Sequence, residues 1–200
     1  MRASLLRRFS AALPLRILAI LVLLPAALGP RPSPAQMPAP PVAAIAPLSL
    51  TASDGTAVTD RTYRGKWLLV YFGYTTCPDT CPTALSEMGA ALDLLGPLAD
   101  AVQPLFVTID PRRDTIDVMA SYVSAFHPRL VGLTGTLQQV AAAARAYHVF
   151  YERDESESGA FEHSAYLYLV DRAGELVKPL PPDATGKQIA GELAELMQRP

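Results

Sequence analysis

The sequence predicts an α/β sandwich, in which a mixed central sheet with an N-terminal hairpin is flanked by helices. Three observations predict it. Continuous apolar runs alternate with segments whose apolar residues recur every three or four positions, as buried strands alternating with helices do. Two further strand-like segments, joined by a turn, and a last amphipathic segment close the chain. The only two cysteines of the 200 residues, Cys77 and Cys81, stand where the first apolar run gives way to a helical pattern.

The first 35 residues are expected to lie outside the folded domain. Residues 1–35 combine a basic start, an apolar run over 17–29 and small residues with prolines, as a signal peptide does. The apolar run is shorter than the roughly 20 residues of a membrane helix, so cleavage after export is expected, with a retained N-terminal membrane anchor as the alternative. Residues 36–46 are rich in Pro and Ala and read as a linker, which leaves 47–200 as the domain.

The charge distribution bears on the partners of this domain. Five of the 17 basic residues lie in 1–35, which hold no acidic residue, so 12 basic residues face all 19 acidic ones in the rest of the chain. An acidic domain is a poor binder of nucleic acid. It suits a soluble protein that meets cationic or metal-ion partners, although solubility alone would explain the charge.

The first strands follow from turn signals and apolar runs. Residues 48–51 alternate, Asp54 and Gly55 signal a turn, and 57–59 can return, which predicts a short hairpin. The continuous apolar run 67–72 predicts a central buried strand that leads directly to the cysteines.

The middle of the chain alternates helices and strands. Apolar residues at helical spacing predict helices from about 82 to 95 and from 115 to 127. Apolar runs at 105–109 and 130–133 predict the strands after each of them. A capping box at Thr136 opens a third helix, which ends near 147.

The last third predicts extended segments around an acidic loop. Residues 149–151 are extended, and the acidic stretch 152–162 is an exposed loop or hairpin tip. His163 is expected to open a strand that runs to 170, followed by a turn and a strand at 175–178. A second capping box at Thr185 opens the final helix.

The two cysteines carry the chemistry. A helix N-terminus favours the thiolate, and two thiols at such a strand-to-helix turn suggest a thioredoxin-like arrangement. Cysteines four positions apart can both reach one ion or each other, and thiolates select Cu(I) and also suit zinc. A structural disulfide is the alternative in an oxidising compartment, but it would close too short a loop to stabilise the fold much.

Three histidines are candidates for a third ligand. His127 stands at a helix end and His148 at a helix–strand junction, where neither needs a functional reason. His163 joins the acidic loop to an apolar strand, and such a loop can carry it over the cysteine turn. Position alone therefore favours His163 without settling the choice.

Four stretches resemble the Sco/SenC family. Residues 72–82, Phe-Gly-Tyr-Thr-Thr-Cys-Pro-Asp-Thr-Cys-Pro, are similar to its signature, and 110–115, 132–135 and 163–164 agree in order. The resemblance covers about 47–198. It implies a thioredoxin-like, membrane-linked copper chaperone for cytochrome c oxidase assembly.

The resemblance also implies a set of site residues. Cys77, Cys81 and His163 are expected as copper ligands, sufficient for Cu(I), whereas Cu(II) would want a further oxygen or nitrogen donor. Asp110 is similar to the family's acidic residue near copper, where it would orient the site, or else it caps the turn before Pro111. Asp79 either tunes the thiols and contacts a partner or is an ordinary turn residue.

Two positions depart from the family pattern. Thr80 stands where an aliphatic residue is usual, and Glu162 stands where Asp is common before the histidine. Neither departure removes a ligand, but both could shift copper affinity or redox potential.

The implied function is a copper-binding assembly factor rather than an enzyme. It would deliver copper to the dinuclear copper centre of oxidase subunit II, with an upstream copper donor and a thiol reductant as further partners. The implied location is the periplasm, or the periplasmic face of the inner membrane, of a bacterium.

Two rival activities use the same thiols. A thiol–disulfide reductase could keep the cysteines of subunit II reduced. Against a general oxidoreductase, three residues rather than two separate the cysteines, and no proline occurs over 131–178, where thioredoxins place one facing their thiols. A thiol peroxidase is disfavoured because 73–76 lack the expected proline.

Overall fold

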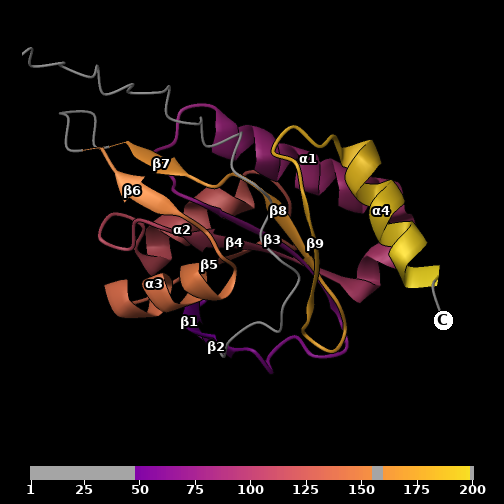
Figure 1. The fold of residues 1–200 in the computed structure, drawn as a ribbon, viewed down its shortest axis with the longest axis horizontal. Coiled ribbons are helices and arrows are strands. Elements are labelled where there is room, and N and C mark those ends of the chain that lie inside the picture. Colours follow the sequence, from indigo (N-terminus) through magenta and orange to yellow (C-terminus); the bar gives the residue numbers. More distant parts are fainter. Residues whose placement is uncertain (1–47, 155–159, 199–200) are drawn as a thin grey trace, which may run out of the picture. The chain divides into compact units, whose positions relative to one another are not determined.

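The computed structural model describes residues 48–154 and 160–198, coloured by sequence in Figure 1. The expected leader (1–35) and linker (36–46) lie outside the described residues. Within the described part of the chain, no helix combines the length and the apolar character needed to cross a membrane.

A seven-stranded mixed sheet forms the centre of the domain, in the order β2-β1-β5-β4-β3-β8-β9. The strands are β1 (Ser49–Ala52), β2 (Ala57–Thr59), β3 (Trp67–Gly73), β4 (Val102–Thr108), β5 (Val131–Thr134), β8 (Leu167–Val170) and β9 (Leu176–Leu180). Strands β3, β4 and β5 are parallel, whereas β8 pairs antiparallel with β3 and β1 antiparallel with β5. The predicted mixed sheet is confirmed, and the N-terminal hairpin extends it at one edge.

Helices cover both faces of this sheet. They are α1 (Thr80–Leu95), the 3-10 helix η2 (Gly96–Ala101), α2 (Ile116–Ser124), α3 (Leu137–Ala146) and α4 (Gly186–Gln198). Helices α1 and α4 lie side by side in Figure 1. Their close approach depends on Gly186, because a Cβ there would lie 2.8 Å from the Cβ of Ala90.

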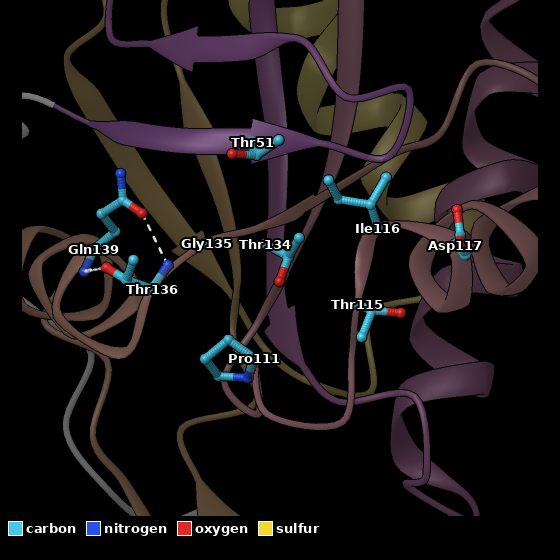
Figure 2. A pocket seen from close by; sticks show the side chains of 9 residues that line it. All are labelled: Thr51, Pro111, Thr115, Ile116, Asp117, Thr134, Gly135, Thr136 and Gln139. Atoms are coloured by element: carbon cyan, nitrogen blue, oxygen red, sulfur yellow. Dashed lines mark hydrogen bonds between the residues drawn. The ribbon is translucent and has the colours of Figure 1, made fainter.

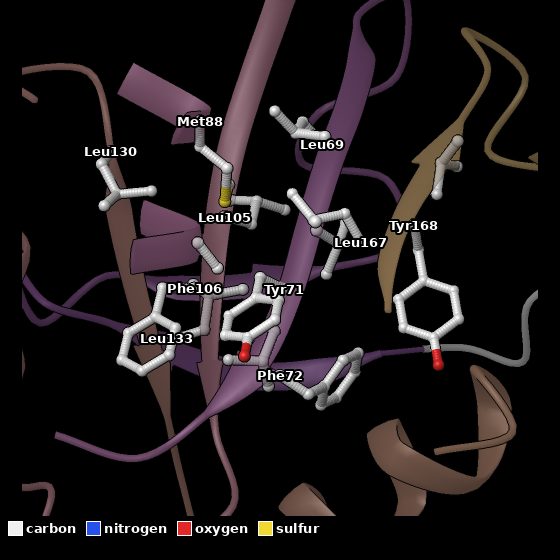
Figure 3. Close-up of a cluster of buried hydrophobic side chains, with 14 of the residues drawn as sticks. Leu69, Tyr71, Phe72, Met88, Leu105, Phe106, Leu130, Leu133, Leu167 and Tyr168 are labelled. Carbon is white, nitrogen blue, oxygen red and sulfur yellow. The ribbon is translucent and has the colours of Figure 1, made fainter. Parts of the chain in front are cut away.

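Successive side chains of β3 point to opposite faces of the sheet and so belong to two different layers of the core; Figure 3 shows Tyr71 and Phe72 among the buried side chains. Tyr71 stacks on Phe106, which in turn contacts Tyr122 of α2. Phe72, on the opposite face, packs against Tyr147 at the end of α3. Because both faces are buried, β3 is a rigid base for the segment that follows it.

Several predicted element boundaries were wrong. Helix α2 ends at Ser124 rather than at residue 127. Helix α1 begins at Thr80 rather than near Pro82, so Cys81 lies within its first turn, where a following proline is tolerated. Strand β4 runs from Val102 to Thr108 and contains Pro104, whereas the predicted strand covered 105–109. Pro104 is tolerated because it pairs only with β3, and pairing with β5 starts one residue later.

His163 does not open the strand that follows it, contrary to the prediction. It ends β7 (Phe161–His163), which pairs antiparallel with β6 (Tyr151–Arg153) in a separate two-stranded sheet. The extended segment before the acidic loop supplies this partner strand, and β8 begins only at Leu167. The loop or hairpin tip predicted over 152–162 was too long, because 152–153 belong to β6 and 161–162 to β7; residues 155–159 lie outside the described residues.

Candidate metal centre

The cysteine turn is held between β3 and α1. Cys77 is half-buried, Cys81 is fully buried, and neither forms a disulfide. Gly73, the last residue of β3, makes room for the buried thiol, because a Cβ at this position would lie 2.6 Å from the Cys81 sulfur. The turn is tied to the sheet through Thr75, whose backbone N–H and hydroxyl both donate to the buried carboxylate of Asp114, at 3.1 and 2.5 Å.

Cys77 is the more acidic thiol. A hydrogen bond from the Cys81 thiol, together with the backbone N–H groups of Cys81 and Asp79, lowers the pKa of Cys77 from 9.0 to about 5, although burial opposes the shift. The neighbouring His163 lowers it further. Cys77 is therefore a thiolate at neutral pH, the form that binds metal and attacks disulfides.

Cys81 has the opposite character. Its hydrogen bond to Cys77 and its burial raise its pKa far above the ordinary value of a thiol. Its other polar neighbours are the backbone of Tyr74 and the hydroxyl of Tyr71, which lies 4.0 Å from its sulfur. Cys81 is thus a protonated donor beneath the Cys77 thiolate until a metal or a disulfide partner displaces its proton.

His163 is buried at the end of β7. Its Nδ1 lies 3.1 Å from the carbonyl oxygen of Ser164, and the edges of Tyr71 and Tyr74 enclose its ring at centroid distances of 6.3 and 6.2 Å. Burial lowers the pKa of His163 below 6.5. The imidazole is therefore neutral at neutral pH and could offer Nε2 to a metal while Nδ1 donates to the Ser164 carbonyl.

A surface cleft of about 430 Å³ joins the two halves of this site. It is lined by Tyr74, Cys77, Pro78, Asp79, Thr80, Ala160, Phe161, Glu162, His163, Ala165 and Pro182. Cys77 and His163 thus share one cleft, with Cys81 directly behind Cys77. Among residues 48–154 and 160–198, no three His, Cys, Asp or Glu side chains are already grouped so that they could hold a metal ion.

The two predicted supporting aspartates have different positions. Asp79 lines the cleft, but its backbone N–H rather than its exposed carboxylate interacts with Cys77. Asp110 is buried outside the cleft lining and forms an ion pair of 2.8 Å with Arg153 on β6. It also accepts backbone hydrogen bonds through its carbonyl from Arg113 and Asp114, so the turn role is observed as well.

The other two histidines lie elsewhere. His127 accepts a hydrogen bond from the Arg129 N–H at Nδ1, and its Nε2 lies 3.7 Å from Asp93. His148 is exposed after α3, with a left-handed φ of 55°. Neither lines the cysteine cleft.

Sequence reasoning missed two residues that join the hairpin to the body. The hydroxyl of Tyr74 accepts the Phe161 N–H at 3.4 Å, and the two rings contact at 5.2 Å. Arg153 reaches Asp110, which precedes it by 43 positions. Tyr74 stands two residues after a buried strand and close to Cys77, which could have marked it. No local pattern marks Arg153.

A larger cavity offers no comparable chemistry. Figure 2 shows a cavity of about 580 Å³ between the starts of α2 and α3. Its lining includes hydroxyls such as Thr134 and the capping pair Thr136 and Gln139, and its one ionisable residue is Asp117. Without a thiol or an imidazole, it presents no soft ligand for a metal.

Relatives of known identity match the domain. The human "Protein SCO1 homolog, mitochondrial" is 41% identical over 157 residues, 76% of this chain and 52% of the relative. A "SCO2-like protein" of Rickettsia felis is 36% identical and is matched over 70% of each chain. This chain spans about half the length of the first curated relatives that it matches.

Solved structures confirm the thioredoxin-like fold. Arabidopsis thaliana ScoI with copper bound superimposes with a TM-score of 0.73 at 36% identity, over 78% of this chain and all of that one. Bradyrhizobium japonicum ScoI with copper bound gives a TM-score of 0.71 at 39% identity, over 76% of this chain and 99% of that one. The profile of the SCO1/SenC family matches residues 37–198, and the chain belongs to this family.

Proposed function

We propose that this chain binds copper through Cys77, Cys81 and His163 and delivers it to the dinuclear copper centre of cytochrome c oxidase subunit II. The observation that carries the proposal is the shared cleft: a Cys77 thiolate and a neutral His163 line it, and a second thiol lies directly behind the first. Relatives solved with copper bound are 36% and 39% identical to this chain.

The donor set fits copper better than zinc. Two thiolates and one imidazole satisfy Cu(I), whereas a structural zinc site normally takes four ligands. Cu(II) would need a further oxygen or nitrogen donor, and two exposed acidic residues, Asp79 and Glu162, are among those that line the cleft. The proposed cargo is therefore Cu(I), with Cu(II) as the second state.

Loading would draw the three side chains together. His163 stands on a hairpin outside the main sheet, so it is the ligand whose backbone can move without breaking the strand pairing of β3; only its ring contacts with Tyr71 and Tyr74 would change. A site with one mobile ligand suits transfer, because a partner's ligands can replace the histidine while the thiolates still hold the ion.

The proposed location and partners follow from the family and the leader. We place the chain at the periplasm, or at the periplasmic face of the inner membrane, of a bacterium, with membrane association through the N-terminus. An upstream copper donor would load the site. A thiol reductant would keep Cys77 and Cys81 reduced, since oxidation to a disulfide removes both sulfur ligands.

A second function is favoured by the unequal thiols. An accessible thiolate at Cys77 backed by a buried thiol at Cys81 is the arrangement of a thiol–disulfide reductase, with Cys77 attacking and Cys81 resolving the mixed disulfide. The protein would then reduce the cysteines of subunit II before copper insertion.

Paired assays on one acceptor separate the two functions. The reduced chain is mixed anaerobically with an apo subunit II fragment: it is loaded with one Cu(I) when the cysteines of the fragment are reduced, and is used both loaded and metal-free when they are oxidised. Copper appearing on the reduced fragment supports delivery, and His163→Ala should then lower the yield of loaded donor. Reduction of the oxidised fragment without any copper movement in either arm would replace delivery by the reductase function.

A further inference from the structure

The hairpin that carries His163 packs against the body through the rings of Tyr151, Phe161 and His163, and one ion pair adds to these contacts. It forms its own two-stranded sheet, and its register places Tyr151 opposite His163 and Arg153 opposite Phe161. One attachment is the Tyr74–Phe161 contact described above. Another comes from the other strand of the hairpin, β6, where the Arg153 guanidinium lies 2.8 Å from Asp110 Oδ1.

Asp110 is a fixed anchor for this second attachment. Its side chain is 2% exposed, and its backbone N–H donates to the Thr108 hydroxyl at 2.8 Å, which holds it at the end of β4. Its other oxygen, Oδ2, accepts no hydrogen bond from the described residues, and Arg113 approaches it only to 3.7 Å. Arg153 is therefore the main partner of a buried carboxylate, a contact that is costly to lose.

Arg153 connects this anchor to the histidine strand. Its guanidinium lies over the ring of Phe161 at 4.7 Å, two residues before His163 on β7. One side chain thus contacts β7 from one side and the end of β4 from the other. Strand β4 lies beside β3, which leads into the cysteine turn, so this chain of contacts ties the position of His163 to that of the thiols.

We propose that the Arg153–Asp110 ion pair is a latch that holds the β6–β7 hairpin, and with it His163, against the cysteine turn. Arg153 and Asp110 are positioning residues that set how firmly the third ligand is kept on the metal and how readily it is released. The proposal rests on the proposed function for its consequence on copper, but the latch itself is a property of the metal-free protein.

The main test uses Arg153→Met in the full, reduced chain. Methionine keeps an apolar side chain beside Phe161 and removes the guanidinium, with its charge and its N–H donors. Hydrogen exchange should then speed up about tenfold at the β6–β7 amides and stay unchanged in β3 and β4, as local opening predicts. Affinity for Cu(I), measured against a competing chelator, should fall about tenfold, the effect expected when a partner that orients a ligand is lost.

Three variants separate the latch from a general charge effect. Arg113→Met removes the other arginine beside Asp110 without touching the hairpin, so hairpin exchange should stay as in the parent. Arg153→Lys should restore part of the protection. Asp110→Asn combined with Arg153→Met leaves no unpaired buried charge, so recovery of hairpin protection in this double variant would mean that the unpaired charge, not the lost tether, loosened the hairpin.

The copper arm distinguishes failure of the latch from failure of the proposed function. Parent-like hairpin exchange in Arg153→Met overturns the latch, whatever happens to copper. If His163→Ala leaves Cu(I) affinity unchanged, the proposed three-ligand site fails, while the exchange data still decide the latch. If His163→Ala weakens Cu(I) binding and Arg153→Met loosens the hairpin without changing Cu(I) affinity, the positioning role is overturned.

Discussion

The cysteine turn between β3 and α1 and the β6–β7 hairpin that carries His163 line the same cleft, but the structure around them is very different. The cysteines lie between β3, a strand buried on both faces, and the first turn of the long helix α1. Asp114 accepts a hydrogen bond from Thr75 in the loop that leads from β3 to Cys77. His163 comes from a two-stranded sheet that the central sheet does not include. The difference supports the proposed roles, in which the thiols are held in place and the imidazole approaches or leaves the metal.

The two supports also prepare their ligands differently. At the turn, hydrogen bonds to sulfur stabilise the charged form of Cys77. On the hairpin, burial stabilises the neutral form of His163. Both donors are thus deprotonated at neutral pH, by opposite physical means.

The largest expected effect is the difference in reactivity between the two thiols of the cysteine turn, Cys77 and Cys81. With a pKa of about 5 instead of 9.0, Cys77 has a thiolate-to-thiol ratio higher by about 10⁴ than an ordinary cysteine at the same pH. Alkylation of the metal-free chain by iodoacetamide should therefore occur at Cys77 first and slow down only as the pH falls towards 5. Peptide mapping that finds Cys81 modified first would reverse the assigned roles.

The same shift links stability to pH. Because the folded pKa of Cys77 lies below its unfolded value, its stabilising contribution is complete above about pH 9 and is lost as the pH falls to about 5. The raised pKa of Cys81 acts in the opposite sense above pH 9. The reduced chain should gain stability between pH 5 and 9, and Cys77→Ser should remove that gain in urea unfolding curves.

Hydrogen exchange compares the two halves directly. Amides of β3, paired with β4 and β8 on its two edges, should exchange at least about a thousandfold more slowly than those of β6 and β7, since local stability follows burial and pairing. Mass spectrometry of peptides from each strand measures this ratio. Equal protection in both halves would remove the basis for a mobile third ligand.

A pair of glycine substitutions tests how tightly the side chains are packed around Cys81. Gly73→Ala places a Cβ against the Cys81 sulfur and should cost about 1–3 kcal/mol of unfolding free energy, as overpacking does. Gly191→Ala in α4 meets open space and should instead gain about 0.5–1 kcal/mol. Urea unfolding of both variants gives the two signs, and a neutral Gly73→Ala would show that the thiol is free to move.

The smallest effect concerns a histidine outside both halves. His148 adopts a φ of 55°, and glycine there would relieve left-handed strain but add entropy to the unfolded chain, for a net gain of about 0.5 kcal/mol. Copper binding by His148→Gly should match the parent in a chelator competition, because His148 does not line the cleft. Weaker copper binding would bring His148 back as a candidate ligand.

Sequence patterns predicted most of the fold because its signals are local. Apolar runs marked the parallel strands, and capping residues marked the start of α3 at Thr136, where the capping box is present. The errors came from tertiary context. Pro104 is tolerated in β4 because the pairing with β5 begins only at Leu105, so no partner strand needs its missing N–H. His163 ends a strand rather than opening one because residues 161–163 pair with 151–153.

The candidate site was predictable only in part. The spacing of Cys77 and Cys81 marked the thiols, and the family resemblance singled out His163. The partnership of Asp110 with Arg153 could not be predicted, because an ion pair between distant segments leaves no periodic or compositional trace. Asp79 illustrates the same limit: it lowers the pKa of Cys77 through its backbone N–H, which every residue but proline carries, so its side chain gave no signal for this contact.

X-ray absorption of the chain loaded with one equivalent of Cu(I) tests the central claim most directly. One ion held by both halves predicts two sulfur ligands and one nitrogen ligand, with the nitrogen lost and both sulfurs kept in His163→Ala. A spectrum with sulfur ligands alone in the parent, or one that His163→Ala leaves unchanged, would contradict a copper site that bridges the cysteine turn and the hairpin.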